Sequence, residues 1–467
     1  MKKSGRKIRR KLFKLVTRLV LILAAAFFVV WGLWATGSCL LGLRGNTINT
    51  NLFFYDDIVG TLVPVQRDVE GGSAYLENVV RALIEGPIEG EHVQATINPQ
   101  TRLRGIAVEE GLATVNLSSE FQTLVNPQVV SEKMVAYSVI NTLTLTGEID
   151  RVRFLVDGQT PTHLSNETKL FDLSGEYTEL TEEPPPTREY SLFFPDIDNR
   201  FIAAEKTRVR QTVDTAETAK LLVRRYLQGP KNDFLVSPLS PKTQVGQVTL
   251  SQSLLTVDLS SDAYESNLSA DGETSMLSSL TWTLTELPGV LKVKILIGGI
   301  QANTIGGHHD IREPLTRWDE DRLVDIEGVG VPILIYFSYE TPDGDFLLVP
   351  RWRFIPTTDD LVKKAFELLL IGPDADESEL AIGTCIPRET TGSAVTEGSQ
   401  ISCNLMLGDK QKEIENQAYE AMLVSQLVHT LTETSRNTSE VQITIDDLIQ
   451  ESLPYGTSIS GSLLRNP

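Results

Sequence analysis

A seven-residue stretch that ends in Gly-Pro returns twice along the chain, each time after 143 residues. It reads RALIEGP at 81–87, and its counterparts RRYLQGP and ELLLIGP end at Pro230 and Pro373. A motif that serves one catalytic centre has no reason to recur at the size of a domain, whereas a folding unit copied in tandem does. The sequence therefore predicts three copies of one domain.

The residues before each Gly-Pro pair have the spacing of a helix with one buried face. Counted back from Gly86, the apolar positions follow i, i+3, i+4, i+7 and i+8. We expect the glycine to close each helix in a left-handed conformation and the proline to prevent its continuation. The fifteen equivalent positions are all apolar or aromatic: Leu76, Val79, Val80, Leu83 and Ile84; Ala219, Leu222, Val223, Tyr226 and Leu227; Val362, Ala365, Phe366, Leu369 and Leu370.

Each copy also shows the same order of strand and helix patterns. Two strands come first, as in NLFFYDD and TLVPVQRDV, and the Gly-Pro helix follows them. A second strand pair, a second helix and a closing strand complete the unit. The order β-β-α-β-β-α-β predicts an α+β fold of three tandem two-layer domains, each with a mainly antiparallel sheet and helices on one face, after an N-terminal transmembrane helix.

Composition changes along the chain suggest where these domains begin and end. The acidic, proline-rich stretch 179–189 is typical of a stiff spacer. The expected organisation is a basic cytoplasmic segment at 1–18, a transmembrane helix at 19–43, domain 1 at 46–178, a linker at 179–189, domain 2 at 190–315, a linker at 316–330 and a divergent domain 3 at 331–467.

The N-terminus predicts attachment to a membrane. Residues 1–18 hold nine Lys or Arg and no acidic residue, and the 25 residues from Leu19 to Leu43 hold no charge. A run of about 20 apolar residues spans a bilayer. The positive-inside rule then keeps the basic segment in the cytoplasm and exports the three domains.

Two alternatives to a permanent span remain open. One is a cleaved signal peptide. The other is a lipoprotein anchored at Cys39, because small residues precede this cysteine in TGSC after an apolar run. Against lipidation, Thr36 stands where such signals carry leucine.

The net charge argues against one class of partner. The chain has a formal charge of −20, so the part beyond the nine basic residues carries −29. Binding to nucleic acid requires clustered cations. We therefore expect no nucleic acid as partner.

No motif predicts a catalytic, cofactor-binding or metal-binding residue. The cluster His308, His309 and Asp310 lies in an extended segment, where neighbouring side chains point apart. The stretches 196–200 and 342–345 resemble calcium loops only faintly and suit the turn of the first hairpin. His429 is interpreted as a surface residue of the second helix.

The chain has three cysteines, too few for a disulfide-based fold. Cys385 and Cys403 lie in neighbouring predicted strands. They could pair in an oxidising compartment, or they could serve as small buried core residues.

The order and spacing of these segments carry a resemblance. The opening LFFYDD with LVPVQRDV, the helix-closing GP, the strand TVDLSS and the segment TLTELPGVLKVKILIGG resemble the GerM domain of bacterial sporulation and germination proteins. The resemblance implies an envelope protein with a membrane or lipid anchor, a fold similar to ring-building domains, and no enzymatic activity. The third copy departs from the one or two that are familiar in this family.

Three functional hypotheses follow. The first is a membrane-anchored extracytoplasmic scaffold that binds other envelope proteins or itself. The second is a module that binds cell-wall glycan or peptide, which requires a concave pocket lined by aromatic and polar residues. The third is a wall hydrolase, which requires a cleft with a carboxyl group of raised pKa.

Overall fold

The computed structural model describes residues 47–127, 129–161, 173–178, 185–317, 331–355, 360–434 and 440–465. The chain divides into two compact units. The first spans residues 1–57 and 61–183, and the second spans residues 58–60 and 184–467. The first unit holds one copy of the repeat (repeat 1, 47–178), and the second holds repeat 2 (185–317) and repeat 3 (331–465). The expected transmembrane helix at 19–43 lies outside the described residues.

Repeat 1 begins with an antiparallel hairpin, β1–β2, that forms a sheet of its own. A second sheet has the order β3-β4-β5-β6, in which β4 and β5 are parallel and the outer pairs are antiparallel. The elements are β1 Thr47–Asp56, β2 Thr61–Glu70, α2 Tyr75–Glu85, β3 Leu103–Glu109, β4 Leu112–Leu117, the 3-10 helix η1 Ser119–Gln122, α3 Glu132–Thr144, β5 Arg151–Val156 and β6 Glu176–Tyr177.

Repeat 2 has the same order and a sheet β12-β11-β10-β9, with β13 pairing β11. Its hairpin β7–β8 is antiparallel, and its strands β10 and β11 are parallel. The elements are β7 Thr187–Pro195, β8 Ile202–Arg210, α4 Thr215–Leu227, β9 Val245–Ser251, β10 Leu254–Leu259, η2 Ser261–Ser266, α5 Ala270–Leu284, β11 Lys292–Ile297, β12 Ile300–Gln301 and β13 Leu315–Thr316.

Repeat 3 follows the pattern again, with a sheet β17-β18-β19-β20. It adds a short helix and a short strand between its first helix and this sheet. The elements are β14 Val331–Glu340, β15 Phe346–Ile355, α6 Leu361–Ile371, α7 Ala375–Glu379, β16 Ile382–Gly383, β17 Thr391–Glu397, β18 Gln400–Met406, η4 Gly408–Glu413, α8 Gln417–Glu433, β19 Glu440–Ile445 and β20 Ser462–Leu464.

The helix stripe that the sequence predicts is confirmed. All fifteen positions are either buried or partly buried against the core. Gly86, Gly229 and Gly372 have positive φ angles of 85°, 85° and 93°. In α2 and α6 the ψ angle of this glycine is −172°, which is outside the expected left-handed helical region. Only glycine adopts these angles readily, so the motif requires glycine more strictly than a left-handed cap would.

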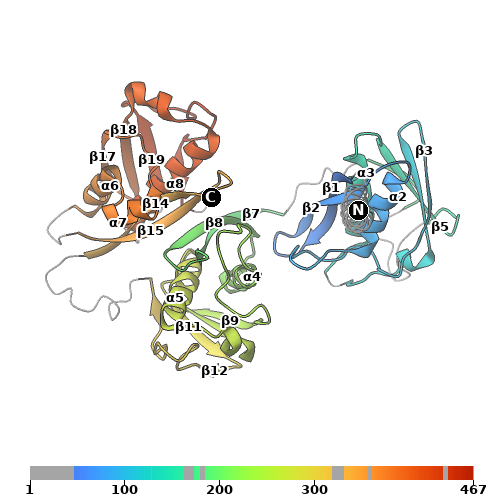
Figure 1. The fold of residues 1–467 in the computed structure, drawn as a ribbon, viewed down its shortest axis with the longest axis horizontal. Coiled ribbons are helices and arrows are strands. Elements are labelled where there is room, and N and C mark those ends of the chain that lie inside the picture. The colour runs from blue at the N-terminus through green and yellow to red at the C-terminus, as the bar shows by residue number, and fades with distance from the viewer. Residues whose placement is uncertain are drawn as a thin grey trace, which may run out of the picture. The chain divides into compact units, whose positions relative to one another are not determined.

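The second helix of each repeat is buried on more than one side. In α3, most residues between Val135 and Leu143 are buried, including polar ones. Such a helix needs neighbours on both sides. In repeat 2, α5 packs against β7 and also against β11 (Figure 1). The α+β fold of three repeats is therefore confirmed, and the first hairpin of each repeat adds a layer separate from the sheet that contains the parallel strand pair.

Among the described residues, no helix has the length and apolar character that a bilayer crossing requires.

Candidate functional site at the joint between repeats 2 and 3

The hairpins of repeats 2 and 3 join through their second strands. Strand β15 pairs antiparallel with β8, with Leu348 opposite Ala204. The result is one sheet of order β16-β14-β15-β8-β7 that belongs to both repeats. We call this strand contact, together with the buried charged and polar side chains beside it, the joint.

Arg317, just after β13, is buried at the centre of the joint. Its Nη2 lies 2.7 Å from Glu286 Oε1, and its Nη1 lies 3.2 Å from Glu433 Oε2. The same guanidinium donates to the carbonyl of Trp282 at 2.7 Å and to Thr285 Oγ1 at 2.9 Å. Arg317 thus links the end of α5 in repeat 2 to the end of α8 in repeat 3.

Arg465 enters the same cluster from the end of the chain. Its Nε donates to both oxygens of Glu286 at 3.0 and 2.9 Å, and its Nη1 donates to Glu433 Oε2 at 2.6 Å. Its Nη2 lies 2.5 Å from the hydroxyl of Tyr336, which itself donates to Glu433 Oε2 at 3.0 Å. Paired, hydrogen-bonded charges are the form in which buried ions are tolerated.

The two arginines and two glutamates balance each other in charge. Burial alone would raise the pKa of Glu286, but the guanidiniums of Arg465 and Arg317 outweigh it and hold this pKa below its usual value. Burial raises the pKa of Tyr336, so its phenol stays protonated. The guanidiniums therefore favour an ionised Glu286, and the cluster is suited to holding two repeats together.

The interpretation of His429 as a surface residue is wrong. Its ring is buried, with 1% of its surface exposed, and contacts both the ring of Tyr336 in β14, at a centroid distance of 5.3 Å, and Ser191 in β7 of repeat 2. Its Nδ1 lies 2.8 Å from the carbonyl of Ser425 and therefore carries the proton, so Nε2 accepts from Ser191 Oγ at 3.2 Å. Burial, followed by Lys206 and Arg465, lowers the pKa of His429 well below its usual value. The imidazole is thus a neutral member of the joint.

One buried hydrogen bond occurs in all three repeats. A threonine in the second helix accepts from a backbone N–H in the first strand, each time at 3.0 Å. The pairs are Thr142 with Phe53, Thr283 with Phe193, and Thr430 with Tyr336. The sequence signal for this bond is the recurring Thr-Leu-Thr at 142–144, 283–285 and 430–432.

Repeats 1 and 3 share a further ion pair, between an arginine of the second hairpin strand and a glutamate that follows the first helix. Arg67 Nη2 lies 2.5 Å from Glu91 Oε2, and Arg353 Nη2 lies 2.5 Å from Glu377 Oε2. In both repeats the glutamate follows the helix-closing glycine by five residues. Although burial opposes it, the hydrogen bond from Arg353 contributes to lowering the pKa of Glu377 to about 2. Arg67 also donates to the carbonyls of Ala82 and Gly86 and so fastens the end of α2 to its hairpin, whereas Arg353 fastens α7 to the hairpin of repeat 3. Both roles are structural.

His308, His309 and Asp310 do not converge on a shared point. His308 Nε2 lies 3.2 Å from the carbonyl of Leu268, His309 Nε2 lies 2.6 Å from Thr274 Oγ1, and Asp310 pairs with Arg312. The loop is held by Glu273, whose carboxylate accepts from the backbone N–H groups of residues 305, 306, 308 and 309. Within the described residues, no three His, Cys, Asp or Glu side chains are placed to hold a metal ion.

Glu420 repeats the role of Glu273 in repeat 3. It accepts from the N–H groups of Tyr455 and Thr457 and so holds the loop after β19. Both glutamates are the fourth residue after the helix N-cap. This buried, repeated carboxylate is not among the residues that the sequence predicts.

The two stretches that resemble calcium loops are hairpin turns, as the sequence predicts. Asp196 is buried, and its Oδ1 accepts from the backbone N–H groups of Arg200 and Phe201 at 2.6 and 2.9 Å. In 342–345, the backbone of Thr341 bonds to that of Asp345. Both arrangements close turns between the paired strands.

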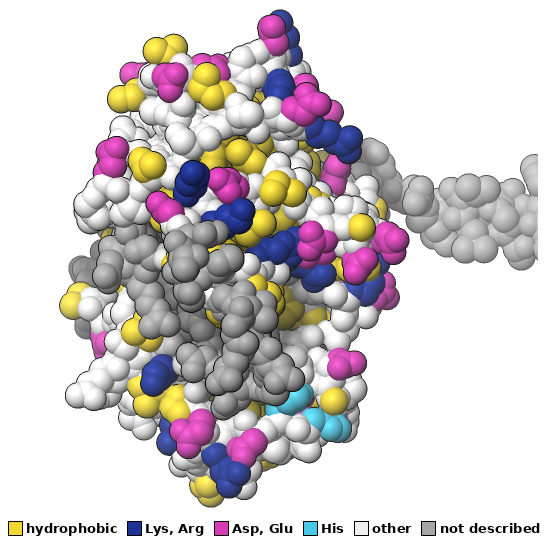
Figure 2. Space-filling view, turned by 90° about the vertical axis from the view of Figure 1, so that its left-hand side faces the viewer, with side chains coloured by type: hydrophobic (Ala, Val, Ile, Leu, Met, Phe, Trp, Pro, Cys, Tyr) yellow, Lys and Arg dark blue, Asp and Glu magenta, His cyan; other side chains and the backbone are white. Residues whose placement is uncertain are grey.

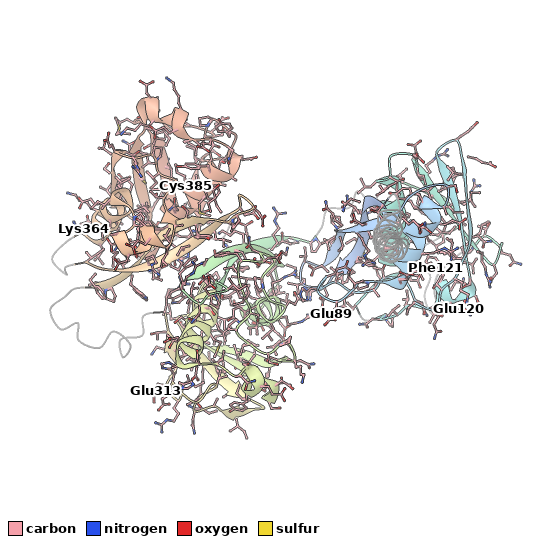
Figure 3. All side chains as sticks on the ribbon, in the orientation of Figure 1. Glu89, Glu120, Phe121, Glu313, Lys364 and Cys385 are labelled. Carbon is pink, nitrogen blue, oxygen red and sulfur yellow. The ribbon has the colours of Figure 1, made fainter. Side chains whose placement is uncertain are left out.

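Cys385 and Cys403 are buried free thiols and do not pair with each other. Cys385 lies in the body of repeat 3 (Figure 3), with its Sγ 3.7 Å from Ser338 Oγ. Burial raises the pKa of Cys385 to about 12. Such thiols are inert core residues.

A cavity of about 440 Å³ opens beside the joint. The aromatic side chains of Phe201, Trp282 and Trp352 line it, together with polar residues that include Asn199 and Arg351. On the face shown in Figure 2, acidic and basic side chains are interspersed rather than gathered into a basic patch. A small polar ligand fits this environment better than a polyanion does.

Fold and joint together define a tandem-repeat protein whose repeated positions build domains and whose repeats 2 and 3 bind each other. A family model described as Germane, sporulation and spore germination, matches residues 51–162, 191–303 and 334–450. The chain therefore belongs to the Germane family. That description relates it to sporulation and spore germination.

Solved structures and curated sequences were also compared. The tandem GerMN domains of the sporulation protein GerM from Bacillus subtilis are 19% identical, with a TM-score of 0.44, over 59% of this chain and 97% of that one. The first GerMN domain of the same protein is 25% identical, with a TM-score of 0.25, over 28% of this chain and 98% of that one. A search of curated protein sequences gave no match.

Proposed function

We propose that this chain is a non-enzymatic scaffold of the bacterial cell envelope, anchored in the membrane with its repeats outside the cytoplasm, and that it acts in sporulation or germination through protein contacts. The observation that carries the proposal is the joint, where the chain uses its own hairpin strands to bind one repeat to another. The features that recur in all three repeats are core, turn and capping residues, which build a fold rather than perform catalysis.

A hydrolase finds less support. Burial raises the pKa of Glu205, which is the property expected of a catalytic acid. However, its carboxylate accepts from the backbone N–H groups of Lys231 and Asn232, so it holds the loop after the helix-closing Gly229. Glu205 does not line the cavity beside the joint.

The cavity favours one alternative, which is binding of cell-wall glycan or peptide. Sugars stack on accessible aromatic rings and bond to polar side chains; the half-buried Trp352 and the side chain of Asn199 both line the cavity. Trp352→Ala should abolish retention of the chain on purified wall polymer if this alternative holds. Unchanged retention, or none in the native chain, would eliminate it.

The scaffold proposal is tested by deleting one whole repeat in the native cell. Loss of repeat 3 should mislocalise a partner protein that chemical crosslinking captures on the native chain. His308→Ala, His309→Ala and Asp310→Ala should change neither localisation nor sporulation. If these three substitutions abolished the function while the chain stayed folded, a catalytic or metal-dependent role would replace the scaffold.

Orientation has its own test. Protease added to intact protoplasts should degrade the repeats, because the basic segment 1–18 is expected to stay inside. Complete protection of the repeats would contradict the proposed orientation.

A further inference from the structure

Strand β2 of repeat 1 has an outer edge, on the side that faces away from β1. Within the first unit, β2 pairs with β1 on one side, and among the described residues no other strand of that unit pairs with it. The equivalent strands of the other repeats, β8 and β15, both use that edge to pair with each other. Repeat 1 therefore presents an edge that the other two repeats cover.

The equivalence of these strands rests on a shared hydrogen bond. The threonine of the second helix bonds to Phe53, Phe193 and Tyr336 in the three repeats. Across the hairpins these residues lie opposite Pro64, Ala204 and Pro350. The second hairpin strands of the three repeats therefore have equivalent positions at Pro64, Ala204 and Pro350.

The joint between repeats 2 and 3 is symmetric in these terms. Leu348, two residues before Pro350, lies opposite Ala204. Leu348 is equivalent to Leu62 of β2, and Ala204 is equivalent to Pro64. The joint therefore pairs position 62 of one strand with position 64 of the other. Val349 and Ala203, both equivalent to Val63, then lie nearest the twofold axis. An edge that pairs this way with its own equivalent is self-complementary, as an isologous dimer requires.

Exposure distinguishes the covered edges from the uncovered one. Ala204 and Pro350 are buried, whereas Pro64 is exposed and Val63 is half-buried. Residues 61–65 carry no charge, so two copies would not oppose like charges in spite of the acidic chain. Natural proteins usually protect a bare edge with charges, and these five residues have none.

A proline at this position does not prevent pairing. Pro64 offers no N–H, but neither does Pro350, which lies in a strand that forms the joint. Proline is tolerated at sheet edges because its missing donor faces away from the neighbouring strand or costs a single bond.

We propose that the outer edge of β2 binds the same edge of a second copy of this chain, antiparallel and centred on Val63, so that the scaffold dimerises through repeat 1 as repeats 2 and 3 join within one chain. This deepens the proposed scaffold function and rests on it. The partner is a second copy because an identical edge supplies the complement that the joint already uses.

The test uses cysteine crosslinking in cells that express the full chain. Val63→Cys, in a Cys39→Ser background, places two thiols on the twofold axis at the 4.5–5.5 Å Cα separation of paired strands, which suits a disulfide. The native Cys385 and Cys403 are buried and do not interfere. Mild oxidation should give a product of twice the chain mass on a gel without reductant.

Gln66→Cys is the matched control on the same strand. Gln66 is exposed. In the proposed dimer, Gln66 of one copy lies six residues along the strand from Gln66 of the other copy, a distance of about 20 Å, so the two cysteines should not crosslink. No dimer with Val63→Cys, equal dimer with Gln66→Cys, or a product of another mass would each overturn the proposal.

A second experiment uses two differently tagged full chains expressed together. Capture of one should recover the other, and Val63→Lys should reduce that recovery at least about tenfold by placing like charges at the axis. Val63→Thr should leave it unchanged. A chain that passes the repeat-deletion test but shows no dimer by either method would remain a scaffold and would refute the dimer alone.

Discussion

Arg465 and Glu286, separated by 179 residues of sequence, form a bidentate ion pair in which Nε lies 2.9 Å from Oε2 and Nη2 lies 2.7 Å from Oε1. Glu286 follows α5 of repeat 2, and Arg465 follows β20, close to the end of the chain. The pair links repeat 3 to repeat 2. Arg465 is therefore part of the joint.

Arg465→Ala should destabilise the second unit by about 3–5 kcal/mol, because it leaves Glu286 and Glu433 buried with a single guanidinium. Urea unfolding of the full chain, followed by tryptophan fluorescence, measures the change. Arg465→Lys keeps the charge but loses the planar fork, so it should recover only part of the loss. An unchanged midpoint for Arg465→Ala would show that the cluster does not hold the joint.

Acid should weaken the joint through His429. The pKa of His429 in the folded chain lies well below its usual value near 6.5, so the unfolded chain takes up a proton first as the pH falls. The stabilisation is complete above about pH 6.5 and decreases below it. Glu286, whose folded pKa is lowered from a usual value of 4.5, adds a second loss at still lower pH. The urea midpoint of unfolding should therefore be lower at pH 5.5 than at pH 7.5.

His429→Gln is the control for this pH dependence. Glutamine does not titrate, so the slope between pH 7.5 and 5.5 should flatten even if the variant is less stable throughout. An equal slope in both proteins would assign the pH dependence to another group.

Gly372→Ala should cost about 1–3 kcal/mol, because its φ of 93° and ψ of −172° suit glycine alone. A Cβ at this position would come no closer than 4.0 Å to Thr384 Cγ2, so the cost is one of backbone conformation. Gly383→Ala is a control in the same repeat, since its φ is not positive and its Cβ would meet nothing within 4 Å. Equal stability of the two variants would contradict the glycine requirement.

Leu83→Asp should unfold repeat 1 or destabilise it by at least about 3 kcal/mol, because Leu83 is fully buried in the stripe of α2. The transition of the second unit should stay in place if the two units unfold independently. Limited proteolysis with mass spectrometry would locate the cleavage. Cleavage confined to repeats 2 and 3 would contradict the assignment of the stripe.

The repeat itself could be predicted because it depends on local pattern. The spacing of Val79, Val80, Leu83 and Ile84 and the glycine at 86 define a helix and its end within twelve residues. The positions of the second helices followed from the same periodicity. Their burial on two sides did not, because a hairpin that covers a helix is a tertiary contact.

The joint could not be predicted because its parts are distant in sequence. Arg317 lies at the border of a predicted linker, and Arg465 lies near the chain end, where charged residues are usually solvated. The sequence indicates an exposed His429 because nothing local reveals its contacts with Tyr336 and with Ser191 of another repeat. The recurring threonines and glutamates did carry a signal, since Thr-Leu-Thr is present in all three copies.

Thr283→Val should destabilise the second unit by about 1–3 kcal/mol. Valine keeps the size and β-branching of threonine but removes Oγ1, which leaves the buried N–H of Phe193 without the acceptor that lies 3.0 Å away. Thr430→Val should act in the same way on Tyr336, and Thr142→Val should act on Phe53 in repeat 1. The three variants test one bond in three places.

Hydrogen exchange gives the decisive measurement for these variants, because it reports the amide that loses its partner. The amide of Phe193 should exchange faster in Thr283→Val, while those of Phe53 and Tyr336 keep their native rates. Thr256→Val, in the half-buried middle of β10, is the matched control and should change neither stability by more than about 0.5 kcal/mol nor the exchange of Phe193. If Thr283→Val matched this control, the repeated threonine would be a packing residue, and its hydroxyl would not hold the hairpin to the helix.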